Sequence, residues 1–258
     1  MKLLTFLPEG LVRYLNYRKR FRDLNLSPNF ALYRKYRQAL EVSKIELLPR
    51  NQVTSLRLVV DVGANLGTYC TAIAYLTNAD QIIAYEPMPE IYQQLKENTR
   101  NIHKIHCVES AIGAHVGKIT LNIEKKHQLS SVMKISDEIK KDYKITEEDT
   151  DCITVPITTL DKDLTEYDEI SLLKVDVQGF EPTVFSGARE ILKRTKILMT
   201  EVTYTPHYYG DSQFMSYLDL IISISDLRLW GVSAPSCSIR GRPLFADAIF
   251  AHKSLMNS

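Results

Sequence analysis

Along most of the chain, short apolar runs alternate with segments whose apolar residues recur at helical spacing. The apolar run that ends before Gly63 predicts a strand, and residues 67–76 predict the helix that follows it. A second strand and helix are predicted at 81–86 and 89–98. Continuous apolar runs separated by helices are typical of parallel strands that are buried on both faces. The pattern therefore predicts an α/β fold with a mostly parallel sheet.

The later part of the chain repeats this order. Strands are predicted at 104–110, 152–158, 170–176 and 196–201, and helices at about 181–194 and 213–225. Residues 113–123 alternate around Gly117 and predict a hairpin, whereas 227–232 and 244–252 predict an antiparallel pair. Residues 124–151 are polar and have no clean period, so we expect a loop or lid there.

Four predicted strands end in an acidic residue. These residues are Asp61, Glu86, Asp176 and Glu201. The carboxyl ends of parallel strands meet at one edge of an open sheet, where such folds bind their ligands. We therefore expect the four carboxylates to line one crevice.

The turn after the first strand predicts a nucleoside site. Gly63 and Gly67 permit a tight turn and a close approach of the backbone to a ligand, and Glu86 follows at the spacing of a ribose-binding acid. Asn65 replaces the middle glycine of a dinucleotide loop, and Asp61 opens the turn. A carboxylate repels a diphosphate and attracts an ammonium group. S-adenosylmethionine, which carries an amino acid, a sulfonium and a ribose, fits this turn better than NAD.

Two other functions stay open at this point. They are an NAD-dependent oxidoreductase and a catalytically silent binding protein with the same fold. A purely structural interpretation also exists, in which Asp61 caps the helix and Glu86 is an exposed strand end.

The length and charge of the chain divide it into two parts. At 258 residues, it is long enough for one sizeable core. Residues 1–50 hold 11 Lys or Arg against 4 Asp or Glu, with seven interleaved aromatic residues, and predict a basic helical arm. Residues 51–258 are predicted to form the catalytic domain, after a linker that ends near Ser55. The arm is expected to contact an anionic acceptor or a membrane surface, with nucleic acid less favoured, or to pack its aromatic side chains on the core.

The cysteines indicate the cellular compartment of the protein. Cys70, Cys107, Cys152 and Cys237 lack metal-binding or redox spacing, so they are predicted to be buried, reduced thiols. No apolar run approaches the length of a membrane span. Both observations indicate a cytoplasmic protein, at most peripheral to a membrane. The sequence leaves the oligomeric state open.

Several motifs together resemble the FkbM family of S-adenosylmethionine-dependent methyltransferases. They are Asp61-Val62-Gly63-Ala64-Asn65-Leu66-Gly67, Tyr85-Glu86-Pro87, Ser110-Ala111-Ile112-Gly113, Leu173-Lys174-Val175-Asp176-Val177-Gln178-Gly179-Phe180-Glu181, Phe185-Ser186-Gly187-Ala188 and Asp247-Ala248-Ile249-Phe250. The resemblance covers residues 59–252. It implies a class I methyltransferase sheet with a reversed last strand and helices on both faces. It further implies O-methylation of a hydroxyl on a sugar, glycan or secondary metabolite.

The resemblance also assigns roles to individual residues. It places Asp61, Gly63, Asn65 and Gly67 along the methionine moiety, Glu86 on the ribose hydroxyls, Ser110 with Ala111 near the adenine, and Asp176 near the transferred methyl group. Gln178 stands where many relatives carry glutamate.

Methyl transfer from a sulfonium requires an aligned oxygen and a group that removes its proton. Asp176 is the first candidate for the base or orienting group, and Glu201 is the second. His207 lies in the loop after Glu201 and is a further candidate. In a less favoured alternative, Asp176 and Glu201 jointly hold a divalent cation that acidifies the hydroxyl.

Overall fold

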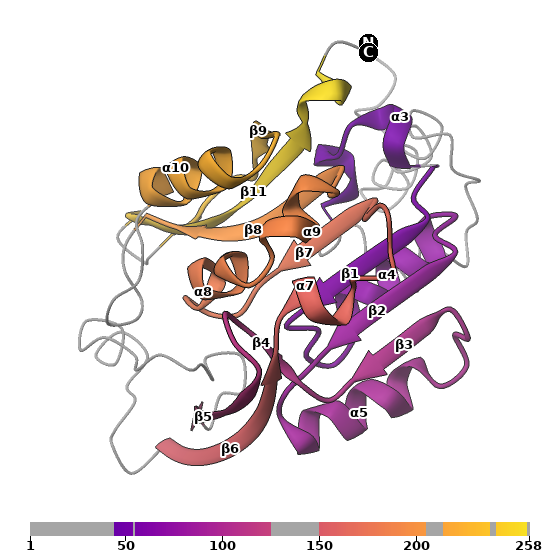
Figure 1. The fold of residues 1–258 in the computed structure, drawn as a ribbon, viewed down its shortest axis with the longest axis vertical. Coiled ribbons are helices and arrows are strands. Elements are labelled where there is room, and N and C mark those ends of the chain that lie inside the picture. Colours follow the sequence, from indigo (N-terminus) through magenta and orange to yellow (C-terminus); the bar gives the residue numbers. More distant parts are fainter. Residues whose placement is uncertain (1–43, 54, 125–149, 205–213, 238–240, 257–258) are drawn as a thin grey trace, which may run out of the picture.

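The structure is a computed structural model that describes residues 44–53, 55–124, 150–204, 214–237 and 241–256. Most of the predicted basic arm, most of the polar segment 124–151 and His207 lie outside the described residues. The remaining chain forms a twisted sheet with helices on both sides (Figure 1).

The main sheet contains eight described strands. They are β1 Leu58–Val62, β2 Gln81–Tyr85, β3 Ile105–Val108, β7 Leu172–Val175, β8 Ile197–Thr203, β9 Leu227–Val232, β10 Ser236–Cys237 and β11 Pro243–His252. Their order is β10-β11-β8-β7-β1-β2-β3, and β9 pairs with the other part of β11. Strands β3, β2, β1, β7 and β8 are parallel, whereas β11 runs antiparallel to β8. The predicted mostly parallel sheet with a reversed last strand is confirmed.

The described α-helices are α3 Arg50–Val53, α4 Thr68–Leu76, α5 Pro89–Thr99, α7 Leu160–Asp163, α8 Glu181–Ser186, α9 Arg189–Lys193 and α10 Phe214–Ile224. Helices were predicted at the positions of α4, α5, α8 with α9, and α10, whereas the short helices α3 and α7 were not predicted. The single helix expected at 181–194 is divided into α8 and α9. A side chain at Gly187 would lie 2.0 Å from the carbonyl oxygen of Gly113, so the chain breaks the helix where it passes close to another backbone segment.

A second, smaller sheet lies beside the main one. Its strands are β4 Ala111–Ile112, β5 Gly117–Glu124 and β6 Thr150–Thr158, in the order β4-β6-β5. The predicted hairpin over 113–123 is wrong, because β5 pairs antiparallel with β6 and β4 pairs parallel with β6. Alternation along a segment indicates that a strand forms but does not identify the strand that pairs with it.

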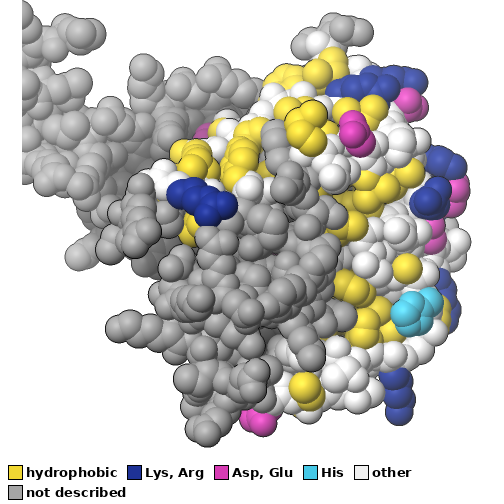
Figure 2. All heavy atoms as spheres, turned by 90° about the vertical axis from the view of Figure 1, so that its left-hand side faces the viewer, with side chains coloured by type: hydrophobic (Ala, Val, Ile, Leu, Met, Phe, Trp, Pro, Cys, Tyr) yellow, Lys and Arg dark blue, Asp and Glu magenta, His cyan; other side chains and the backbone are white. Residues whose placement is uncertain are grey.

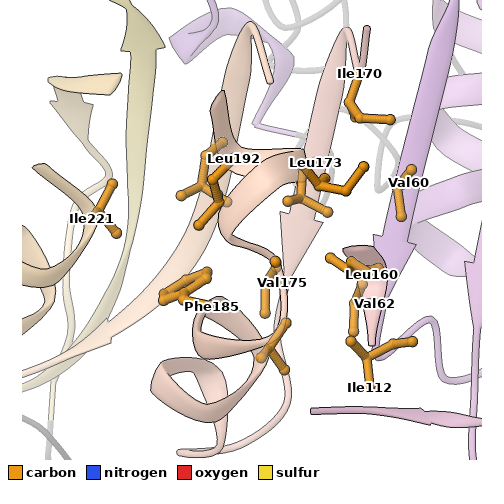
Figure 3. Close-up of a cluster of buried hydrophobic side chains, with 14 of the residues drawn as sticks. Val60, Val62, Ile112, Leu160, Ile170, Leu173, Val175, Phe185, Leu192 and Ile221 are labelled. Atoms are coloured by element: carbon orange, nitrogen blue, oxygen red, sulfur yellow. The ribbon is translucent and has the colours of Figure 1, made fainter. Parts of the chain in front are cut away.

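Each main strand alternates its side chains between two layers. We call the side covered by α4 the α4 face; it carries Val59, Leu172, Met199 and Ile249. We call the opposite side the α8 face; it carries Val60, Leu173, Leu198 and Phe250. Figure 3 shows part of the apolar cluster on this face, with side chains from the strands and from the helices that cover them. Helices α8, α9 and α10 cover this second layer (Figure 1).

The segment before β1 packs into the core. A short 3₁₀ helix spans Ile45–Leu47, and Ile45, Leu48 and Val53 are buried in the apolar cluster on the α4 face. The expected linker is therefore a packed segment, because Val53 points into the core. The domain boundary at residue 50 stays a prediction.

The cysteines are less uniformly buried than predicted. All four are free thiols, and Cys70 is buried while Cys107 is partly buried. Cys152 and Cys237 are exposed, as are the neighbouring residues Asp151 in β6 and Ser236 in β10. Among the described helices, none combines the length and apolar character that a membrane span requires.

The surface has an apolar region on α10 and β9. Its large exposed side chains are Met215, Ile222 and Trp230. Figure 2 shows apolar side chains, with charged groups between them, on the side where α10 lies in Figure 1.

Candidate active site

The carboxyl ends of β1, β7 and β8 and the amino-terminal half of the antiparallel β11 bring charged side chains together on the α4 face. Asp61 in β1 is the register partner of Lys174 in β7, and Glu201 in β8 is the partner of Asp247 in β11. Asp176 follows Lys174 by two residues and continues the same alternation. These five residues are called the charged row below. The row begins where the apolar part of the α4 face ends.

Lys174 connects two carboxylates of the row. Its Nζ atom lies 3.4 Å from Oδ1 of Asp61 and 3.2 Å from Oδ2 of Asp176. The same Nζ lies 5.2 Å from the centre of the Tyr69 ring. The side chain of Asp61 is 0% exposed, that of Lys174 is 11% exposed and that of Asp176 is 35% exposed. The three groups thus extend from the interior to the solvent edge of the site.

The burial of these groups affects their charge states. Burial opposes the Lys174 ammonium, but Asp176 and Asp61 outweigh this effect and raise its pKa. Burial raises the pKa of Asp61, whereas Lys174 acts in the opposite direction. Within the described part of the chain, neither Asp61 oxygen receives a hydrogen bond of good geometry. Lys174 is therefore the only described cation that compensates Asp61 directly.

The turn after β1 holds Glu86 in a fixed position. The Asn65 N–H donates to Oε2 of Glu86 at 2.9 Å, and the Met88 N–H donates to Oε1 at 2.9 Å. Glu86 is only 5% exposed, and burial raises its pKa to about 7, although the two backbone hydrogen bonds oppose this rise. The carboxylate at the end of β2 is thus attached to the turn at the end of β1.

Backbone conformation explains why glycine or asparagine stands at three positions of this turn. Gly63, Asn65 and Gly67 all have positive φ, at 80°, 50° and 82°. A side chain at Gly63 would lie 1.9 Å from the carbonyl oxygen of Asp176. Gly63 therefore allows the ends of β1 and β7 to approach each other closely.

The loop after β7 contacts the carboxylate oxygen of Asp176 that Lys174 does not contact. Gln178 has a φ of 56°, and its Nε2 donates to Oδ1 of Asp176 at 3.0 Å. The loop is anchored by Glu181, which accepts hydrogen bonds from the Val177 N–H at 2.8 Å and from the Tyr217 hydroxyl at 2.9 Å. Both oxygens of Asp176 consequently have a partner. Gln178 thus serves as a hydrogen-bond donor to Asp176.

Glu201 and Asp247 form the far end of the charged row. Burial, followed by the nearby carboxylates of Asp176, Glu181 and Asp247, raises the pKa of Glu201 well above its usual value. Asp247 also has a raised pKa, mainly because it is partly buried. The Ser233 hydroxyl lies 3.5 Å from Oδ2 of Asp247, and Nζ of Lys44 lies 3.9 Å from the same oxygen.

The residues expected near the adenine lie where the two sheets meet. Ser110 is buried after β3, and its hydroxyl donates to the Ala111 carbonyl at 2.9 Å. Ala111 begins β4 and is the register partner of Ile157 in β6. Their contact with a cofactor stays a prediction, as does any role of His207, which is outside the described residues. In the described ranges, no group of three or more His, Cys, Asp or Glu side chains is arranged to hold a metal ion.

Several residues of the site were not identified from the sequence. Lys174 interrupts the apolar run of β7, and a charge within a buried strand is the signal that would have revealed it. Asp247 stands within the otherwise apolar end of the chain for the same reason. The contact of Glu181 with Tyr217 joins residues 36 positions apart, so no local pattern could have predicted it.

The strand order, the reversed β11 and the turn between β1 and α4 together define a class I methyltransferase fold. The chain belongs to the FkbM methyltransferase family, because the Methyltransferase FkbM domain matches residues 61–228, more than half of its length.

Individual known proteins are also similar to this chain. The 2-O-methyltransferase NoeI of Sinorhizobium fredii (strain NBRC 101917 / NGR234) is 25% identical over 203 residues, which cover 74% of this chain and 83% of NoeI. The structure of Methyltransferase FkbM from Methylobacillus flagellatus KT is 14% identical, with a TM-score of 0.48, and the match covers 93% of this chain and 60% of that chain. Aeropyrum pernix fibrillarin is 10% identical, with a TM-score of 0.46 and coverage of 83% and 73%.

Proposed function

We propose that the protein is an S-adenosylmethionine-dependent O-methyltransferase that acts on a hydroxyl of a sugar, glycan or secondary metabolite. The main support is the charged row on the α4 face, which ends next to the turn that holds Glu86. Membership of the FkbM family supports methyl transfer. The name of the relative NoeI, a 2-O-methyltransferase, supports oxygen as the accepting atom.

The polar groups of the site fit a cationic nucleoside. Glu86, fixed by two backbone N–H groups, retains lone pairs for a ribose diol. The charged row contains four carboxyl groups and one ammonium, a composition that favours a sulfonium cation and disfavours a diphosphate. Gly63, Asn65 and Gly67 would border the methionine part, and Ser110 with Ala111 the adenine. An NAD site is the less favourable match to these groups.

We assign different roles to the two candidate acids. When bound, S-adenosylmethionine supplies an electrophilic methyl group. Asp176 is held by Lys174 and Gln178 and is partly exposed, which suits a carboxylate that accepts a hydrogen bond from the acceptor hydroxyl and orients it. Burial raises the pKa of Glu201 well above its usual value, which makes its ionised carboxylate a stronger base than an ordinary one. Glu201 is thus the proposed general base, with His207 as a further candidate.

A first experiment tests the cofactor. Isothermal titration with S-adenosylhomocysteine is expected to show binding by the wild type and weaker binding by Glu86→Ala, because hydrogen bonds to a charged group contribute about 1.5–3 kcal/mol each. Glu97→Ala, which removes an exposed acid of α5, is the matched control. Equal affinity in all three proteins would contradict the assigned ribose site, and preferential binding of NADH would favour an oxidoreductase.

A second experiment tests the reaction. The protein is incubated with S-adenosylmethionine carrying a labelled methyl group and with extracts of glycans and small metabolites, and labelled products are identified by mass spectrometry. A methylated hydroxyl supports the proposal, whereas cofactor binding without any labelled product supports a catalytically silent protein. Loss of labelling in the presence of a chelator would instead support a divalent cation held by Asp176 and Glu201.

We further propose that the basic arm contacts an anionic or membrane-linked acceptor. Residues 1–50 carry its excess positive charge, but Ile45 and Leu48 belong to the core. A truncation that removes residues 1–43 is therefore preferable to one that removes 1–50. This truncation is expected to raise the KM for the acceptor and to leave the affinity for S-adenosylhomocysteine unchanged. An unchanged acceptor KM would refute the proposed role.

A further inference from the structure

Lys174 is a lysine in the middle of an otherwise apolar strand. Its neighbours Leu173 and Val175 are fully buried, and its own side chain is only 11% exposed. Burial of an ammonium group is costly unless carboxylates and other electron-rich groups surround it. Here these groups are the carboxylates of Asp61 and Asp176 and the face of the Tyr69 ring.

The three charges have a fixed order. Asp61 lies deepest and is completely buried, and the register of β1 with β7 sets it directly beside Lys174. Asp176 lies at the solvent side, with 35% of its side chain exposed. The ammonium is therefore held from the interior by one carboxylate and holds the other carboxylate at the edge of the crevice.

This order changes the interpretation of Asp61. The sequence predicted that the Asp61 carboxylate attracts an ammonium group of the ligand. In the structure, an ammonium group is present within the protein itself, at 3.4 Å, and it belongs to Lys174. Because Asp61 has no exposed surface, its role toward a ligand passes through Lys174 and Asp176.

We propose that Lys174 is a positioning residue that fixes Asp176 and sets the charge facing the transferred methyl group, with Asp61 as the internal support of its ammonium. This inference rests on the proposed cofactor site. The Lys174 ammonium offsets one of the two carboxylates of Asp61 and Asp176. These three groups, called the triad below, therefore present one net negative charge to a bound sulfonium.

The net charge has a catalytic consequence. The positive charge of a sulfonium disperses during methyl transfer, so a site that stabilises the sulfonium too strongly stabilises the ground state more than the transition state. Lys174 limits this ground-state stabilisation. At the same time, it keeps the Asp176 carboxylate in one orientation for the acceptor hydroxyl.

A comparison of two ligands reports the charge near the transferred methyl group and needs no methyl acceptor. S-adenosylmethionine carries the sulfonium cation, and S-adenosylhomocysteine has a neutral sulfur in its place. The ratio of their dissociation constants therefore reports the electrostatic potential near the methyl group, and effects common to both ligands cancel. Calorimetric titration of the full chain with each ligand gives this ratio.

The variants separate the charge of Lys174 from its structural contribution. Lys174→Met alone leaves Asp61 buried without a cation and is expected to lower the melting temperature. The double variant Asp61→Asn/Lys174→Met removes both charges and is expected to recover most of that loss. Lys174→Arg preserves the charge and tests rescue, and Lys193→Met, at an exposed lysine of α9, is the matched control.

The expected result has opposite signs in two variants. The double variant keeps the net charge of the triad, but it loses the Lys174 ammonium, which lies nearer the crevice than the fully buried Asp61 carboxylate that it also loses. Its preference for S-adenosylmethionine over S-adenosylhomocysteine should therefore rise by about threefold. Asp61→Asn retains the ammonium and loses a carboxylate, so its preference should fall. Lys174→Arg and Lys193→Met should keep the ratio of the wild type.

Other results would overturn the inference. If the double variant regains its melting temperature and keeps the wild-type ratio, Lys174 is only a structural partner of Asp61. If Lys174→Met does not fold, the double variant and Asp61→Asn still decide the question. A wild type that binds neither ligand would instead refute the proposed function, and the inference would fall with it.

Discussion

The two faces of the main sheet are built from alternate residues of the same strands, yet they end differently. On the α8 face, Val62, Val175 and Val202 continue the apolar layer to the carboxyl ends of their strands. On the α4 face, the apolar layer gives way to the charged row that includes Lys174 and Glu201. One face thus contributes stability along its whole length, and the other adds the proposed chemistry at its end.

This difference shows how one strand serves two purposes. Because successive side chains point to opposite faces, a charged residue on the α4 face leaves the neighbouring apolar residue in place on the α8 face. Strand β7 carries Leu173, Lys174 and Val175 in succession, and helices α8, α9 and α10 still cover an uninterrupted apolar layer. The following variants test whether stability and chemistry are separated in this way.

The largest effect is expected from shortening apolar side chains. Leu172 and Leu173 are both fully buried, on the α4 face and the α8 face respectively. Leu172→Ala and Leu173→Ala should each destabilise the protein by about 2–5 kcal/mol. Urea unfolding measures the loss, and the affinity for S-adenosylhomocysteine below the transition should stay that of the wild type. A loss of affinity in Leu173→Ala alone would contradict the separation of the faces.

The second effect concerns the proposed base. Glu201→Gln keeps the shape of the side chain and removes the proton acceptor, so turnover should fall by about a hundredfold or more. Val202→Ala, one residue along β8 on the α8 face, is the control and should lower stability but not turnover. The acceptor found in the labelled-methyl experiment is the substrate for this comparison.

The raised pKa of Glu201 adds a test with a definite sign. Turnover by the wild type should increase as the pH rises through this pKa, since only the ionised carboxylate accepts a proton. The residual turnover of Glu201→Gln should lack this increase. Full activity of Glu201→Gln would show that another residue is the base.

The smallest effect is expected at Glu86, whose pKa is about 7. As the pH falls below this value, the carboxylate takes up a proton and loses lone pairs for the ribose diol. The affinity for S-adenosylhomocysteine should therefore fall by about tenfold between pH 8 and pH 6. Calorimetry at the two pH values measures this change, and Glu86→Gln should have a weaker affinity that does not vary with pH. An affinity of the wild type that is constant over this range would contradict the assignment.

The raised pKa of Glu86 also makes the stability of the folded state depend on pH. The folded-state pKa of Glu86 is raised above the ordinary value of 4.5, so the folded state binds the proton more tightly than the unfolded state does. The contribution of this group to stability is thus fully present below about pH 4.5 and is lost as the pH rises through about 7. Glu181, with a pKa of about 7, acts in the same direction.

Much of the fold was determined by the sequence alone. Apolar runs and helical spacing predicted β1, α4, β2 and α5 within a few residues, because these elements depend on local periodicity. The reversed strand pair at the end of the chain was predicted as well. The glycine turn and the acids at the strand ends indicated the candidate site, because the ends of parallel strands meet at one edge of a sheet.

Only the tertiary structure decided which of these groups touch. The pairing of β4 with β6, the ion pair of Asp61 with Lys174 and the opposition of Glu201 to Asp247 all join segments far apart in the chain. Periodicity gives the face on which a side chain lies but not its neighbours or its burial. Those depend on strand order and register, which the packing of the whole core determines, and they decide that the cation beside Asp61 comes from the protein itself.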